Sequence, residues 1–114
     1  MENDNRFEMQ KLDIYQVARE LARRVHEAKI QDDELRDQAT RAVKSAFLGL
    51  CEGLPNEQLG LRRKYFTQSN NSLHETVGAV DLALAIGAVN AGDAAAIQAL
   101  AIRLKRMPRP LLGR

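Results

Sequence analysis

The sequence is poor in cysteine, and it lacks both a long apolar run and an apolar N-terminus. Its single cysteine, Cys51, excludes an internal disulfide and fits a reducing compartment. Residues 1–6 are polar and charged, so we expect no signal peptide. The longest uncharged apolar run, Leu82–Val89, falls far short of the roughly 20 residues that a membrane-spanning helix needs. We therefore expect a cytoplasmic protein with no membrane partner.

Aromatic residues are also scarce, since the chain has no Trp, two Tyr and three Phe among 114 residues. The core must then be built from aliphatic side chains and Ala, which suits closely packed helices. The three Pro and most of the seven Gly lie between or after the periodic segments, and no strictly alternating strand pattern competes. The length predicts one all-α domain over residues 1–114, with a flexible lead-in at 1–11 and an irregular tail at 108–114.

Spacing of apolar residues and capping signals predict four helices. The first begins at Asp13, an N-cap with Gln16 at the capping-box spacing, and runs to about Lys29. Asp32 or Asp33 opens the second, which continues to about Glu52 and ends on Gly53 as a left-handed C-cap. The third covers 61–89, and the fourth runs from Ala94 to about Met107 behind a cap at Asp93. Short connections predict an antiparallel up-down bundle.

The third helix is apolar on two sides. One side is a seam with residues seven apart, at Phe66, Leu73, Val80 and Gly87, interleaved with Asn70, Val77 and Leu84. A buried Asn70 must be hydrogen-bonded and can fix register or oligomeric state; alternatively it marks a wet end of the bundle. The other side is a second stripe that a small monomer has little left to cover, and we expect it to be the interface of a homo-oligomer: Ala79, Leu82, Ala83, Ile86 and Val89. Asp81 points outward between the stripes or pairs across a subunit contact.

The net charge of +2 hides an uneven distribution. Residues 1–57 carry nine Lys and Arg against twelve Asp and Glu, whereas residues 58–114 carry eight against three. The basic residues of the second half gather in two clusters, Arg62, Arg63 and Lys64, and then Arg103, Lys105, Arg106 and Arg109. Such clusters are either solvated helix ends that complement the helix dipole or a phosphate-binding surface for RNA or DNA.

No catalytic pattern is present. His26 and His74 lack the Glu three residues earlier that a di-iron bundle requires, and neither extends to the zinc-protease spacing. Cys51 lies beside Glu52 rather than beside a base, which favours a packing role. We expect no enzyme activity, no cofactor and no metal. His74 pairs with Glu75 or with a neighbouring chain.

Glu52 is unusual because a carboxylate in the last turn opposes the helix dipole. We expect it to cap free amides of neighbouring helices or to pair with Lys11, Arg62 or Arg63.

Three segments carry a family resemblance: FEMQKLDIY at 7–15, SAFLGLCEG at 45–53 and SLHE at 72–75. They resemble the bacterial four-helix bundle proteins encoded in intervening sequences of 23S ribosomal RNA genes. The matching positions are Ser45, Glu52, Gly53, Ser72, Leu73 and Glu75, whereas Phe47, Gly49, Leu50 and Cys51 replace the residues usual in the second segment.

The resemblance implies a left-handed bundle that assembles as a ring, commonly a pentamer, and brings no catalytic residues. It also implies kinship with the accessory variability determinant of diversity-generating retroelements, a basic ring that engages nucleic acid and a reverse transcriptase. Two functions stay open: a homo-oligomeric scaffold, and a nucleic-acid-binding accessory protein that uses the basic clusters.

Overall fold

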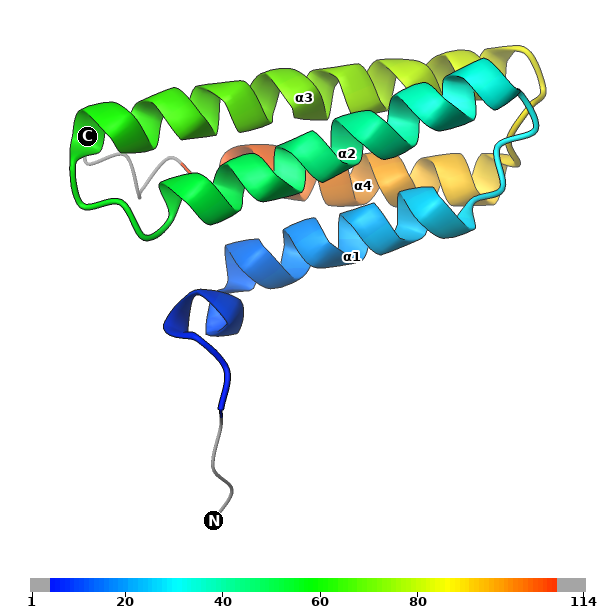
Figure 1. Ribbon diagram of the computed structural model, residues 1–114. Helices are drawn as coiled ribbons and strands as arrows, with labels where there is room; N and C mark the ends of the chain where they lie inside the picture. Colours follow the sequence, from blue (N-terminus) through cyan, green and yellow to red (C-terminus); the bar gives the residue numbers. More distant parts are fainter. Residues whose placement is uncertain (1–4, 109–114) are drawn as a thin grey trace.

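The computed structural model describes residues 5–108, which form a short 3-10 helix and four α-helices without a strand. The elements are η1 (Glu8–Lys11), α1 (Asp13–Glu27), α2 (Asp33–Gly53), α3 (Leu59–Ala85) and α4 (Ala91–Arg106). Consecutive α-helices run in opposite directions, so α2 ends and α3 begins at one end of the bundle, where α4 also ends (Figure 1). The predicted all-helical, four-helix architecture is confirmed. The left-handedness stays a prediction.

The chain enters α1 through a more ordered segment than the predicted lead-in. Glu8–Lys11 forms η1, in which the Gln10 side chain accepts a hydrogen bond from the Phe7 amide at 2.9 Å. Met9 packs against the core, whereas Phe7 stays 76% exposed. The turn of η1 also moves the N-cap of α1 to Leu12, so the predicted capping box at Asp13 is wrong. Gln16 instead donates to the Gln10 carbonyl at 2.6 Å.

Helix α2 begins as predicted but ends for a different reason. The Asp32 carboxylate accepts the Leu35 amide at 2.9 Å, which confirms it as an N-cap. Gly53 is not a left-handed cap: it is the last helical residue, and Leu54 continues in the right-handed region. A Cβ on Gly53 would lie 2.6 Å from the Phe66 ring. This glycine is therefore needed for the close approach of α3.

The end of α3 comes four residues earlier than predicted. Gly87 adopts φ +77°, and its amide donates to the Leu84 carbonyl while the Ala88 amide donates to Ala83 at 2.7 Å. A left-handed glycine after the last turn ends a helix in this way, so Gly87 is a stop rather than part of the seam. Val89 consequently lies in the connection between α3 and α4 and not on a helix face.

The fourth helix begins at Ala91 because Asn90, not Asp93, is its N-cap. The Asn90 side chain accepts the Asp93 amide at 2.7 Å, and its amide group donates to the Asp93 carboxylate at 2.9 Å. Asp93 therefore lies in the first turn, where a carboxylate also favours the dipole.

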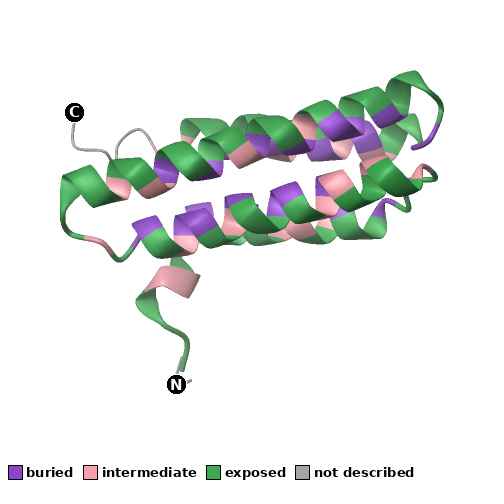
Figure 2. Cartoon of the chain, turned by 45° about the horizontal axis from the view of Figure 1, so that its top comes forward, coloured by how far each residue is buried: buried purple, intermediate pink, exposed green. Residues whose placement is uncertain are grey.

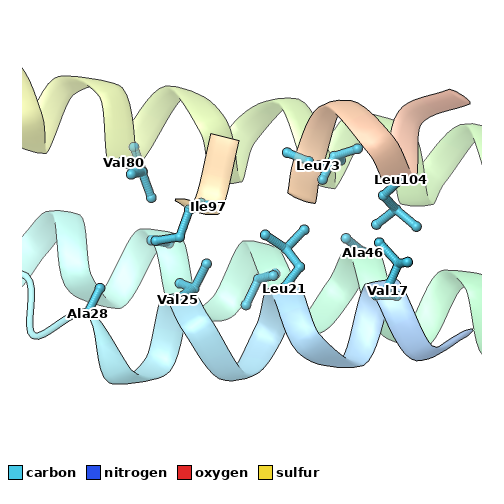
Figure 3. Close-up of a cluster of buried hydrophobic side chains, with 14 of the residues drawn as sticks. Val17, Leu21, Val25, Ala28, Ala46, Leu73, Val80, Ile97 and Leu104 are labelled. Atoms are coloured by element: carbon cyan, nitrogen blue, oxygen red, sulfur yellow. The ribbon is translucent and has the colours of Figure 1, made fainter. Parts of the chain in front are cut away.

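The core fills the space between all four helices with aliphatic side chains. Figure 2 shows the buried positions on the inward sides of the helices, and Figure 3 shows side chains of all four converging. Leu21 and Val25 of α1 and Ile97 of α4 are each no more than 1% exposed. Val89 and Ala88 close the core at the α3–α4 connection.

We predict that Gly53→Ala destabilises the fold by about 1–3 kcal/mol, because the added methyl group overlaps the buried Phe66 ring. Gly78→Ala is the matched control. Gly78 lies within α3 with no atom within 4 Å of its missing Cβ, so alanine there should stabilise by about 0.5–1 kcal/mol. Urea unfolding followed by circular dichroism measures both, and equal effects of the two substitutions would contradict the packing account.

Candidate interaction surfaces

Some residues of the predicted second stripe of α3 are buried in the core, and the others are exposed to solvent. Ala79 and Ala83 are buried within the chain, as is Val89 in the following connection, so these three do not form an exposed interface. Leu82 and Ile86 remain open, with 51% and 56% of their surface exposed. The predicted stripe therefore includes core residues, because its alanines lie on the side of α3 that packs into the bundle. Asp81 is exposed, in agreement with an outward orientation.

The buried polar residues of the α3 seam are Ser69 and Thr76, and not Asn70. Asn70 is exposed, whereas Ser69 is 4% exposed and its hydroxyl donates to the Ala46 carbonyl of α2 at 2.6 Å. Thr76, fully buried, donates to the Ser72 carbonyl at 2.8 Å. The buried residues of α3 are Phe66, Ser69, Leu73, Thr76, Ala79, Val80 and Ala83, and all of them except Ala79 follow the seam. From Phe66 onward, the residues of the seam are therefore separated by three and then four positions, whereas the prediction had four and then three. This spacing arises because the small residues of the seam face the small residues of α2.

A groove runs between α3 and α4. Three hollows of about 450, 250 and 310 Å³ follow one another from the α3–α4 connection to the other end of the bundle. Its apolar lining includes Val77, Leu84 and Ile102, of which Leu84 and Ile102 are 39% and 43% exposed. Asp81 lines one end of the groove, and Lys105 lines the other. No sequence pattern indicated this groove.

His74 and Glu75 face different neighbours. The His74 Nδ1 lies 2.8 Å from the Asn70 carbonyl, and its ring lines the middle hollow of the groove beside Lys105. The Glu75 carboxylate instead accepts a hydrogen bond from the Gln38 amide of α2. The expected pairing between these two residues is therefore not formed within the chain.

The two basic clusters lie toward the same end of the bundle. The first turns of α3 lie beside the last turn of α4, since Thr67 and Asn70 share a hollow with Lys105 (Figure 1). Arg103, Lys105 and Arg106 are exposed there, as is Lys64, whose ammonium lies 5.8 Å from the Tyr65 ring centre. Arg109 lies outside the described residues.

Arg62 has a structural role within that end. It is half-buried, and its guanidinium donates to the carbonyls of Gly53 and Leu54 at 3.4 and 3.0 Å. These carbonyls end α2, where backbone oxygens lack partners and a cation complements the dipole. Arg62 thus ties the start of α3 to the end of α2.

Of the motif residues of α2, Gly53 is buried against Phe66, whereas the other two are exposed. Ser45 and Glu52 lie on the outer surface of α2. Lys11 pairs with Glu8 at 3.1 Å, and Arg62 donates to backbone carbonyls. The pairing of Glu52 with Lys11, Arg62 or Arg63 stays a prediction. Burial, together with the nearby Glu52 carboxylate, raises the pKa of the Cys51 thiol, which disfavours the nucleophilic thiolate.

Within residues 5–108 no group of three or more His, Cys, Asp or Glu is arranged to hold a metal ion. The helices described are also too short or too polar to cross a membrane.

The fold and its surfaces define a small helical bundle that presents a groove and one basic end. The model of the 23S rRNA-intervening sequence protein family matches residues 10–109. The chain therefore belongs to that family, and the resemblance drawn from the three segments is confirmed. A search of curated proteins gave no match.

We predict that Arg62→Ala lowers the free energy of unfolding by about 1 kcal/mol or more, because two carbonyls at the end of α2 lose their charged donor. Lys64→Ala, an exposed basic residue of the same cluster, should change it by less than about 0.5 kcal/mol. Thermal unfolding of both variants measures the difference. An Arg62→Ala variant as stable as Lys64→Ala would show that the cap contributes nothing.

Proposed function

We propose that the protein is a non-catalytic homo-oligomer that forms a ring, five-membered as its family resemblance implies, and acts as a cytoplasmic assembly scaffold. The observation that carries this proposal is the apolar surface that one chain leaves open. Leu82 lies in the last turn of α3 and Ile86 is the C-cap residue of that helix, and each has more than half of its surface exposed. Single exposed apolar residues are normal, but neighbouring pairs on one helix face are typical of contact surfaces.

Further apolar side chains are exposed elsewhere on the chain. Leu48 of α2 is 58% exposed, and Leu84 and Ile102 border the groove between α3 and α4. Full burial of a Leu or Ile side chain contributes about 1.5–3 kcal/mol, so covering the open half of each contributes on the order of 1 kcal/mol. Several such contacts in every interface favour association, and a ring repeats the interface without leaving an open end.

We predict a solution mass of about 64 kDa, five times the 12.7 kDa chain, by light scattering across a dilution series. The double variant Leu82→Gln, Ile86→Gln should shift the mass toward that of one chain, because two amides would have to be buried in the contact. Leu61→Gln is the control, since Leu61 is 38% exposed at the opposite end of the same helix. A 12.7 kDa particle at every concentration would overturn the proposal.

A second candidate function is nucleic-acid binding, favoured by the placement of the two basic clusters toward the same end of the bundle. The exposed residues Lys64, Arg103, Lys105 and Arg106 come from segments about forty residues apart, the start of α3 and the end of α4, which lie toward the same end of the bundle. A ring would repeat this end around its axis and enlarge the basic surface. Such a surface suits phosphate backbones rather than particular bases.

This second function is tested by the anisotropy of labelled RNA and DNA at about 50 and 200 mM salt. Phosphate contacts predict binding that weakens by orders of magnitude over this range. The double variant Lys64→Ala, Arg106→Ala should lower the affinity and the salt dependence together. Absence of binding at the lower salt concentration excludes the function.

A further inference from the structure

The middle hollow of the groove between α3 and α4 combines two nitrogen-bearing side chains with an apolar surface. His74 of α3 and Lys105 of α4 both line this hollow of about 250 Å³. Its other lining residues are Leu73, Val77, Gln98, Ala101 and Ile102. No carboxylate of residues 5–108 lines it. An apolar lining with a few basic groups is suited to a ligand that is apolar along its length and anionic at one end.

Lys105 has no carboxylate to pair with in the described part of the chain. The ion pairs there join Lys11, Arg23 and Arg36 to carboxylates about one turn away, and Lys105 takes part in none of them. Lys105 lies in the last turn of α4, where the helix dipole favours a cation. Its ammonium group is therefore available to an anion that enters the hollow.

His74 offers a second contact, because one of its ring nitrogens is already engaged. The Nδ1 atom lies 2.8 Å from the Asn70 carbonyl, which can only accept, so Nδ1 carries a hydrogen and donates it. Nε2 has no partner among residues 5–108. Nε2 becomes a donor when the imidazole is protonated, and a carboxylate beside the ring favours that form.

The hollow next to it, of about 450 Å³, has room for the apolar part of such a ligand. It shares Val77 and Ile102 with the middle hollow and continues to Leu84. Ile102 and Leu84 are 43% and 39% exposed, so an apolar chain would remove part of their surface from water. Asp81 lines this second hollow, and its carboxylate repels an anionic head group. The side toward α4 has small side chains that leave the space open: Ala91, Ala94, Ala95 and Ala99.

We propose that the groove between α3 and α4 binds a fatty acid, with the carboxylate between Lys105 and His74 and the alkyl chain along the apolar part of the groove. The two hollows extend along α3 from Leu73 to Leu84, roughly 16 Å at 1.5 Å per residue. An extended alkyl chain advances by about 1.3 Å per carbon, so this length accommodates a chain of about ten to twelve carbons. Asp81 sets the direction, because it keeps the carboxylate at the end of the groove that Lys105 lines.

This site is independent of the proposed assembly surface. Leu82 and Ile86, which carry the proposal of a homo-oligomer, line neither of the two hollows. A single chain and an oligomer that leaves the groove open would therefore both bind the ligand.

Calorimetric titration of the full-length protein with decanoate, at about 50 mM salt and pH 7, tests the proposal. We expect saturable binding with a Kd below about 1 mM. Octanoate, which is two methylenes shorter, should bind about tenfold more weakly, because each buried methylene strengthens binding about fourfold. Decyltrimethylammonium has the same chain length and the opposite charge, and it should bind at least tenfold more weakly than decanoate.

Matched substitutions at exposed positions test the head group and the chain separately. Lys105→Gln should weaken decanoate binding about tenfold, because the carboxylate loses a charged donor. Lys64→Gln removes the same charge outside the three hollows and should change the Kd less than twofold. Ile102→Gln should weaken binding about fivefold or more, because an amide would be buried against the chain. Its control is Leu48→Gln, on the outer surface of α2.

Titrations in phosphate and in Tris at the same pH test the contact with His74. A proton taken up by His74 comes from the buffer, so the binding heats should differ between the two buffers. Lys105 opposes this protonation and Asp81 favours it, whereas α2 contributes no residue to either hollow. His74→Gln should abolish the difference, and His26→Gln, at the exposed histidine of α1, should preserve it. Equal heats in both buffers for the wild type would overturn the contact with His74.

Methyl NMR spectra of the same titration locate the ligand. The proposal predicts decanoate-dependent shifts at Val77, Leu84 and Ile102. Absence of saturable binding overturns the inference and leaves the proposed assembly untouched, as does binding that Lys105→Gln and Ile102→Gln do not weaken. Shifts of these methyl groups that follow protein concentration and not decanoate would show that another copy fills the groove, and they would overturn it as well.

Discussion

The close contact between α2 and α3 is the constraint on which the rest of the structure depends. A Cβ on Gly49 would lie 3.0 Å from the Ser69 Cβ, and one on Gly53 would overlap Phe66. Small residues let the two backbones approach, and the hydrogen bond from Ser69 to the Ala46 carbonyl fixes their relative height. Arg62 then ties the far end of the pair together. A helix held this closely on one side leaves more space on the other, and that space is the groove toward α4.

This arrangement explains why the surfaces of the chain serve different purposes. Basic residues at the shared end are not equivalent: Arg62 caps a helix, whereas Lys64 and Lys105 remain exposed. Apolar residues differ in the same way, because Ala79 and Ala83 fill the bundle while Leu82 and Ile86 do not. A residue's role depends on the side of the helix it occupies more than on its type.

Much of the fold follows from the sequence because the relevant interactions are local. Asp32 as the N-cap of α2 is set by a hydrogen bond to the Leu35 amide, three residues along the chain. Predictions were wrong at positions where contacts with another helix determine the local structure. Gly53 reads as a cap in sequence, but it is required by the Phe66 ring of another helix. The phase of the α3 seam could not be chosen between Ser69 and Asn70 without knowing that Ala46 and Gly49 lie opposite.

The candidate surfaces were predictable to a smaller degree. The positions of Lys and Arg in the sequence indicate two basic clusters. They do not indicate that the clusters lie toward the same end of the bundle. The exposed residues Leu82 and Ile86 belong to the predicted stripe. Hydrophobicity alone does not distinguish them from the alanines of the same stripe, which are buried. The groove has no sequence signature, because it arises from the unequal spacing of α3 against its two neighbours.

Amide hydrogen exchange over a range of protein concentrations tests most directly whether α2 and α3 form the tight pair and α4 borders an open groove. The account predicts that amides of residues 42–53 and 66–80 exchange only through global unfolding, with the same opening free energy at every dilution. Amides of α4 should open more easily in dilute protein and become more protected if copies associate as proposed. A single opening free energy shared by all four helices and independent of concentration would contradict the account.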